Sequence, residues 1–147
     1  MKKQILILML SVLSAASFAQ TSKSAKPINT QNSIAIQGYD PVAYFENGKA
    51  TKGNKEFAAT YEDAIYYFST ENNKVTFLKN PSQYVPQFGG YCAYGMSEGH
   101  EASIQPEAFT IVDNKLYLNN SLKVKELWVK DQASRIQKAN ENWYNKK

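Results

Sequence analysis

The 147-residue sequence contains a single cysteine, Cys92, and a single histidine, His100. One cysteine cannot form a disulfide within the chain, so the fold must depend on its apolar core. The same counts exclude Cys-x-x-Cys redox motifs and zinc sites of the usual Cys/His spacing. The sequence also lacks a recognisable Ser/His/Asp arrangement and a glycine loop that would cradle phosphate. These absences favour a binding protein over an enzyme.

Long apolar runs are also missing, since a transmembrane helix needs about 20 apolar residues and no run reaches that length. The short apolar run at residues 5–13 follows Lys2 and Lys3 and precedes the small residues at 17–19. This order is typical of a secretory signal peptide. We therefore expect residues 1–19 to be removed near Ala19. The mature protein would then be periplasmic or secreted, without a stable membrane anchor.

Neither sign of charge dominates, because 17 Lys/Arg stand against 13 Asp/Glu for a formal net charge of +4. Lys2 and Lys3 belong to the expected signal peptide, and the rest of the basic excess lies in residues 121–147. Charges spread along a terminal helix are typical of its solvated face. No nucleic-acid partner is expected.

The domain organisation follows from composition. Residues 20–33 are polar and show no periodicity, which predicts a flexible leader. Residues 34–147 are enough for a single domain, and an aromatic content of 13% provides large side chains for one core.

Alternating and helical patterns predict an α+β fold with mostly antiparallel pairing. The expected fold is a small antiparallel sheet of two hairpins plus a short strand, with one central helix and a C-terminal helical segment. The expected elements are a strand at 42–45, a hairpin at 57–61 and 64–68, a helix from Ser69 or Thr70 to Pro81, a long ordered loop from Pro81 to Pro106, a second hairpin at 109–112 and 116–118, and helices from Ser121 and Asp131.

Several motifs in order resemble the YHS domain. They are Gly-Tyr-Asp-Pro-Val-Ala-Tyr-Phe at 38–45, Tyr-Tyr-Phe-Ser at 66–69, Phe77, Asn-Pro-Ser-Gln-Tyr at 80–84 and Gly-Gly-Tyr-Cys-Ala at 89–93. The last motif is similar to that of exported bacterial YHS-domain proteins, and the resemblance covers residues 34–144. It implies a YHS-like fold and an association with metal handling.

The sequence departs from the metal-binding members that it resembles at three positions. Ala43, Ser69 and Asn73 stand where those domains carry cysteines, so the usual thiolate site is missing. Some relatives of the exported subgroup carry selenocysteine at the position of Cys92. That resemblance implies a reactive chalcogen at Cys92.

Cys92 is therefore the centre of the candidate site. Thiolate, thioether and imidazole together suit copper, which makes Cys92, Met96 and His100 the candidate metal ligands. Glycines on both sides of Cys92 would let backbone N–H groups approach its sulfur. Tyrosines near the motifs, Tyr66 among them, could line a cleft beside it. The candidate pocket residues are Tyr39, Asp40, Tyr44, Gly89, Gly90 and Tyr91.

Three functions remain open at this stage. The first is an exported binding protein for a soft metal ion such as copper, or for a small ligand, centred on Cys92. The second is a thiol-redox protein or peroxide sensor, in which a partner thiol would complete the cycle of Cys92. The third is an interaction module without chemistry, in which Cys92 packs in the core or forms a disulfide with a partner. In the plainest alternative to a metal site, His100 is a solvated loop residue.

Overall fold

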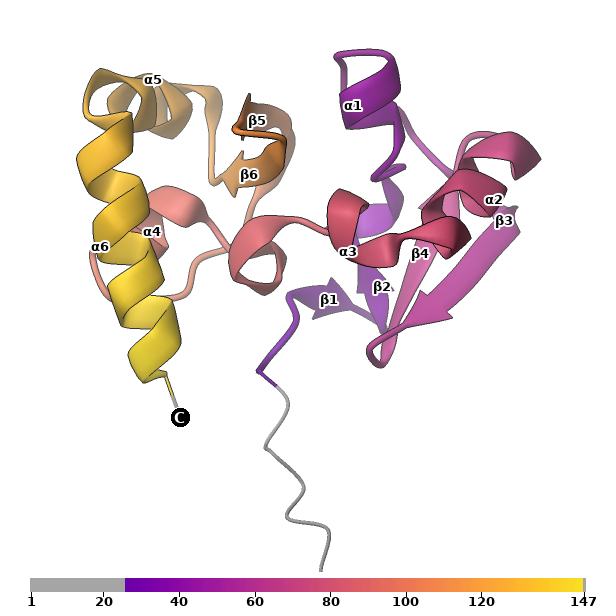
Figure 1. Cartoon of the computed structure of the whole chain (residues 1–147), viewed down its shortest axis with the longest axis horizontal. Coiled ribbons are helices and arrows are strands. Elements are labelled where there is room, and N and C mark those ends of the chain that lie inside the picture. Colours follow the sequence, from indigo (N-terminus) through magenta and orange to yellow (C-terminus); the bar gives the residue numbers. More distant parts are fainter. Residues whose placement is uncertain (1–25, 147) are drawn as a thin grey trace, which may run out of the picture.

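The computed structural model describes residues 26–146, so the expected signal peptide and residues 20–25 of the expected leader lie outside the described residues. The described chain is an α+β fold, as the sequence predicts (Figure 1). None of the helices within residues 26–146 has the length and apolar character needed to cross a membrane.

The N-terminal half is built on a four-stranded sheet in the order β1-β2-β4-β3. Strands β3 and β4 form the first predicted hairpin, and β2 runs parallel to β4 with Ile34 opposite Ile65. The strands are β1 (Thr30–Gln31), β2 (Ile34–Ala35), β3 (Asn54–Tyr61) and β4 (Ala64–Phe68), and the helices are the 3-10 helix η1 (Ile36–Gly38), α1 (Ala43–Glu46), α2 (Glu71–Lys79) and α3 (Pro81–Tyr84).

Local sequence explains the β3–β4–α2 unit. Glu62 and Asp63 both have positive φ, as a tight hairpin turn requires. Alternate residues of β4 are buried, which turns Tyr66 and Phe68 towards the core. Thr70 then caps α2, because its side chain accepts the backbone N–H of Asn73.

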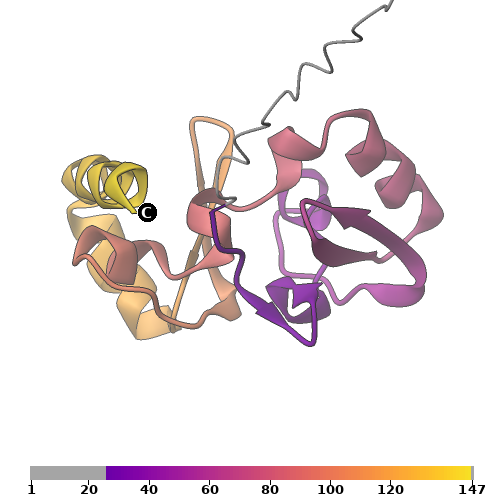
Figure 2. The same ribbon diagram turned by 90° about the horizontal axis from the view of Figure 1, so that it is seen from below.

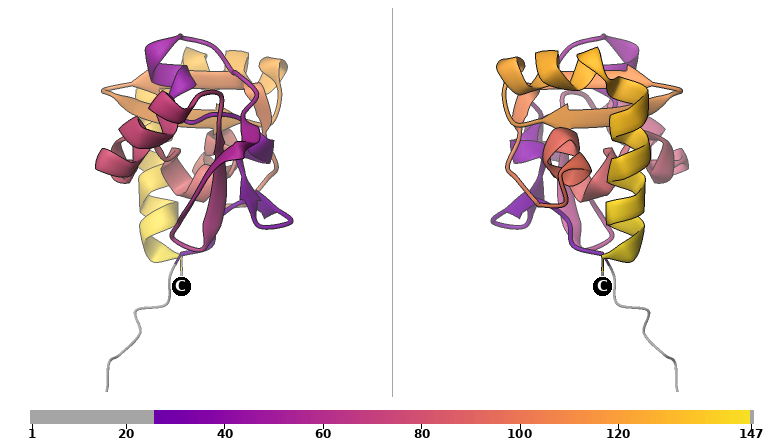
Figure 3. Two further views of the ribbon diagram at one scale, coloured as in Figure 1. Left: turned by 90° about the vertical axis from the view of Figure 1, so that its right-hand side faces the viewer. Right: turned by 90° about the vertical axis from the view of Figure 1, so that its left-hand side faces the viewer.

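The C-terminal half combines the second hairpin with three α-helices and one 3-10 helix. Its elements are the 3-10 helix η2 (Gln87–Gly90), α4 (Ala93–Ser97), β5 (Gln105–Val112), β6 (Lys115–Asn119), α5 (Leu122–Lys130) and α6 (Gln132–Asn145). Asp113 and Asn114 form the hairpin turn with positive φ, and Ser121 caps α5 through Val124 N–H. The long helix α6 packs along α4 on the outside of the molecule (Figures 1 and 3).

Two hydrophobic cores fill the molecule, and β6 separates them. Leu116 and Leu118 point into the first core, which also contains Phe68, Phe77 and Cys92. Tyr117, between those leucines, points into the second core, where it packs against Trp128. The alternation of side chains along a strand thus lets one short element serve both cores.

Three local predictions differ from the structure. Residues 43–46 form helix α1 rather than a strand, because the Asp40 carboxylate accepts the N–H groups of Val42 and Ala43 and so caps a helical turn. The expected loop between Pro81 and Pro106 contains α3 and α4. Asp131 lies at the start of α6 but its side chain makes no capping hydrogen bond.

Order also begins earlier than residue 34. Residues 26–31, here called the N-terminal strap, run along the junction of the two halves before entering the sheet as β1 (Figure 2). The two hairpins belong to separate sheets, one of four strands and one of two. The strap and the separation of the sheets depend on contacts between residues far apart in the sequence. Sequence periodicity does not predict such contacts.

Candidate functional site

Asp40 is a buried carboxylate at the centre of a hydrogen-bond cluster. It is 0% exposed. Its Oδ1 accepts the N–H groups of Val42 and Ala43, at 2.9 and 3.3 Å. Its Oδ2 accepts from Ser69 N (2.7 Å), Ser69 Oγ (2.6 Å) and Asn73 Nδ2 (2.7 Å). Five donors therefore replace the water that the carboxylate loses on burial.

This cluster brings together Ala43, Ser69 and Asn73, the three positions at which the sequence departs from the metal-binding domains that it resembles. Ala43 contributes a backbone N–H, and Ser69 and Asn73 contribute side-chain donors, all to Asp40. The donors are neutral and the carboxylate is fully enclosed. In this chain the cluster is a structural link between α1, β4 and α2 rather than an open pocket.

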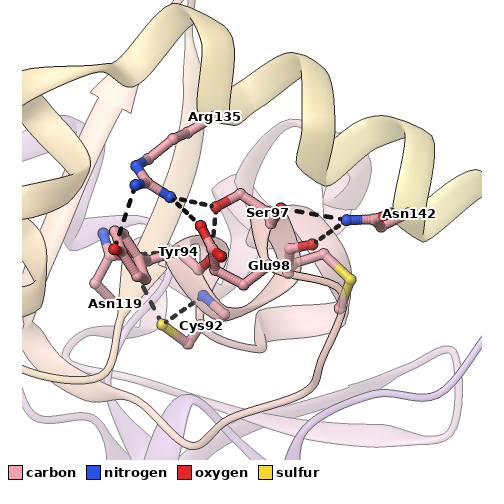
Figure 4. Close-up of polar contacts among 9 residues, drawn as sticks. Cys92, Tyr94, Ser97, Glu98, Asn119, Arg135 and Asn142 are labelled. Atoms are coloured by element: carbon pink, nitrogen blue, oxygen red, sulfur yellow. Dashed lines mark hydrogen bonds and ion pairs between the residues drawn. The ribbon is translucent and has the colours of Figure 1, made fainter.

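Cys92 occupies the N-cap position of α4 and is 1% exposed. Its Sγ accepts the N–H of Gly95 at 3.4 Å, and its thiol lies 3.8 Å from Oδ1 of Asn119 (Figure 4). The same Asn119 oxygen accepts the N–H of Tyr94 at 3.1 Å. A backbone donor thus lies at the sulfur, whereas the burial of Cys92 restricts access to it.

Helix α6 holds α4 in place through two side chains (Figure 4). Arg135 donates to Ser97 Oγ and to the Glu98 carboxylate, and its guanidinium lies 3.9 Å from the ring centroid of Tyr94. The hydrogen bond from Arg135 lowers the pKa of Glu98. Asn142 donates to the Met96 carbonyl at 2.8 Å. The backbone around Cys92 therefore depends on the C-terminal helix.

Two buried donors in this region have no partner among residues 26–146. They are Nδ2 of Asn119 and Nε of Arg135. Buried polar groups are nearly always hydrogen-bonded, and both of these are N–H donors. Asn119 contacts the Cys92 sulfur through its oxygen, and its Nδ2 is the atom without a partner in this part of the chain.

The three candidate metal ligands are grouped around α4, but their side chains do not share one cavity. Met96 is 1% exposed and belongs to the second core, whereas Cys92 belongs to the first. His100 is exposed, and its Nε2 lies 3.3 Å from the point where a Cβ on Gly95 would stand. Gly95 thus lies close to both the sulfur and the imidazole. Within residues 26–146, no group of three or more His, Cys, Asp or Glu side chains could hold a metal ion.

Gly89 and Gly90 carry the N-terminal strap. Asn29 donates its backbone N–H to the Gly89 carbonyl at 2.8 Å and its side-chain amide to the Gly90 carbonyl at 3.0 Å. Gly89 has φ +61°, and a Cβ there would stand 2.3 Å from the Pro27 carbonyl oxygen. The close backbone approach that the sequence predicts is therefore made to the strap, while the N–H at the sulfur comes from Gly95.

The candidate pocket tyrosines have separate structural partners. Tyr44 is buried and donates its hydroxyl to the Pro106 carbonyl, and its burial raises its pKa. Tyr39 donates to Glu107, and this hydrogen bond raises the pKa of Tyr39. Tyr91 is partly buried against the second core, which raises its pKa as well. Of the candidate pocket residues, Gly89 lines a hollow that the strap also lines.

Sequence reasoning missed Asn119 and Arg135, which shape the surroundings of Cys92. Asn119 carries a weak signal, because it is a polar residue at the end of the apolar run 116–118 and is itself 0% exposed. Arg135 carries none, since one arginine on an amphipathic helix is usually solvated.

Comparison with known proteins identifies one region. Residues 42–88 match the family model described as the YHS domain. The matched region includes α1, the β3–β4 hairpin and α2. The match ends four residues before Cys92. No curated protein and no solved structure matches the chain.

Proposed function

We propose that this YHS domain-containing protein is an exported binding protein for a soft metal ion, and that Cys92 is its central ligand. The observation that supports this most is the arrangement around Gly95. Its N–H nitrogen lies 3.4 Å from the Cys92 sulfur, and the His100 Nε2 lies 3.3 Å from the position that a Cβ on Gly95 would take. A thiol and an imidazole thus both lie close to one residue that has no side chain.

The chemistry of these donors favours Cu(I). Thiolate is a soft ligand and imidazole suits copper, whereas neither selects magnesium or calcium. Metal binding would release the thiol proton, and the Gly95 N–H would support the anion that remains. Because His100 is exposed and Cys92 is buried, an arriving ion would meet the imidazole first.

Met96 is the third candidate ligand, one helical turn beyond Cys92. Its backbone N–H donates to the Cys92 carbonyl at 2.9 Å, so the two residues lie on neighbouring turns. Its thioether packs in the second core with Trp128 and Ala139. We therefore assign the primary pair to Cys92 and His100, with Met96 as the matched control.

Titration with Cu(I) under reducing conditions, against a competing chromophoric chelator, tests this assignment. We expect Cys92→Ser to weaken Cu(I) binding at least about 100-fold and His100→Gln about tenfold, because each removes one first-sphere ligand. Met96→Leu should stay within about twofold of wild type. Thermal unfolding of each variant checks that the fold is intact. Equal affinity of wild type and Cys92→Ser would remove Cys92 from the site.

A thiol-redox role is the second candidate. It is favoured by buried Asn119, whose Oδ1 lies 3.8 Å from the sulfur and whose Nδ2 has no partner among residues 26–146. The Cys92 thiolate would attack hydrogen peroxide to give a sulfenic acid and hydroxide, and Nδ2 would donate to the new oxygen. A partner thiol would then displace hydroxyl, which leaves as water, to form a mixed disulfide. The 1% exposure of Cys92 requires local opening for that second step.

Trapping of the sulfenic acid by dimedone, followed by mass spectrometry, measures this reactivity. We expect protein that meets peroxide while folded, and dimedone only after unfolding in urea, to have formed sulfenic acid at least about tenfold faster than protein unfolded throughout. The reason is that only the fold places donors at the sulfur. Asn119→Leu should remove most of this advantage, with Asn120→Ala as the control on the neighbouring residue. A folded rate at or below the unfolded rate would contradict a redox role.

A further inference from the structure

A hollow of about 560 Å³ lies beside Gly89, where the two halves of the molecule meet. It is bounded by the strap, by the turn between β3 and β4, by residues 85–89 and by α6. A volume in this range is typical of sites for small molecules, which occur preferentially where two structural units meet. The lining residues used below are Lys26, Glu62, Asp63, Tyr66, Phe88 and Trp143.

Tyr66 provides a polar group inside this hollow. The residue is 3% exposed, and it lines the hollow. Burial, reinforced by the negative charge of Glu62, raises the pKa of Tyr66, so the hydroxyl stays protonated at neutral pH. The hydroxyl is not one of the sealed, unpartnered atoms of residues 26–146, so it can hydrogen-bond with a molecule in the hollow.

The charge that remains free around the hollow is negative. Glu62 and Asp63 form no ion pair within residues 26–146. Lys26, the basic residue of the lining, donates to the Trp143 carbonyl and lies over the rings of Trp143 and Tyr144, at 5.1 and 5.8 Å. Its ammonium therefore interacts with α6, and the two carboxylates have no cationic partner in the described part of the chain.

Aromatic side chains form an apolar wall of the same hollow. The Phe88 and Trp143 rings meet edge to face with centroids 6.3 Å apart, and both residues line the space. Phe88 holds a positive φ of 57°, an uncommon conformation for an aromatic residue, and it lies directly before Gly89. The wall is thus fixed by η2 and by the helix that covers it.

We propose that this hollow binds a small organic ammonium compound. Its ammonium group would pair with Glu62 and Asp63, its apolar body would lie against Phe88 and Trp143, and the Tyr66 hydroxyl would hydrogen-bond to it. This site shares no side chain with the Cys92 site, and it stands whether or not Cys92 binds a metal ion.

Three probes of one size and different charge test the proposal by NMR titration of backbone amides. They are 2-phenylethylamine, 2-phenylethanol and phenylacetate, which are cationic, neutral and anionic at pH 7. We expect the amine to bind at least about fivefold more tightly than the alcohol, and phenylacetate to bind most weakly of the three. The shifted amides should fall in the strap, the β3–β4 turn and residues 85–89.

Variants separate the contributions of the groups. Glu62→Gln with Asp63→Asn should abolish the preference for the amine, and both changes suit the turn, because asparagine tolerates positive φ. Tyr66→Phe should weaken binding about threefold. Glu56→Gln, an exposed carboxylate of β3 outside the lining, and Cys92→Ser should bind the amine as wild type does. Equal binding of the three probes, shifts elsewhere on the protein or equal losses in Glu56→Gln would overturn the proposal.

Discussion

Replacement of Asp40 by alanine is expected to lower the free energy of unfolding by at least about 4 kcal/mol. The change removes the acceptor of five hydrogen bonds, and each orphaned buried donor costs about 1–3 kcal/mol before water enters to relieve it. Single substitutions of this size are rare and indicate a buried network. Urea unfolding followed by circular dichroism measures the loss.

Two further variants define the role of Asp40. Asp40→Asn keeps the size of the side chain but presents an amide to donors, so we expect roughly half the loss of Asp40→Ala. Glu126→Ala, an exposed carboxylate on α5, should change stability by less than about 0.5 kcal/mol. A loss below about 1 kcal/mol for Asp40→Ala would mean that the five hydrogen bonds do not hold α1 to α2.

Gly89→Ala should lower the free energy of unfolding by about 3 kcal/mol. Part of this, about 1 kcal/mol, arises because alanine is disfavoured at φ +61°. The rest arises because the new methyl group would stand 2.3 Å from the Pro27 carbonyl oxygen and 3.1 Å from the Trp143 ring. The strap must then move, and the hydrogen bonds from Asn29 to Gly89 and Gly90 are lost.

Gly48→Ala is a matched control for this result. Gly48 has φ +64°, nearly that of Gly89, but nothing lies within 4 Å of the site of its Cβ. We expect it to cost about 1 kcal/mol, so the difference between the two variants isolates the contact with the strap. Hydrogen exchange should also show faster exchange of Asn29 N–H in Gly89→Ala alone. Equal losses in the two variants would indicate that the strap contributes nothing.

The parts of the fold that the sequence predicts are those governed by local chemistry. The Glu62-Asp63 and Asp113-Asn114 turns, the Thr70 and Ser121 caps and the alternation along β4 and β6 follow from residues within a few positions of one another. The prediction of a strand at residues 42–45, where the structure has helix α1, was wrong because a specific side-chain contact outweighs the local preference. These residues favour strands, but Asp40 overrides that preference through two backbone hydrogen bonds.

The candidate site could be predicted only in part. Cys92 is conspicuous in the sequence because it is the single cysteine and lies in a glycine-rich motif. Asn119 of β6 and Arg135 of α6, which shape its surroundings, are 27 or more residues away in the sequence. The glycines of that motif act on different partners, since Gly89 and Gly90 receive the strap whereas Gly95 donates to the sulfur. Sequence spacing also cannot show that Cys92 and Met96 face different cores.

The division into two cores has a spectroscopic consequence. The protein has two tryptophans, and both lie in or against the second core, whereas the first core contains phenylalanine and tyrosine. Tryptophan fluorescence will therefore report on the C-terminal half alone, and circular dichroism on both halves. Because β6 supplies side chains to both cores, we expect the two signals to change at the same urea concentration, as in a single cooperative unit.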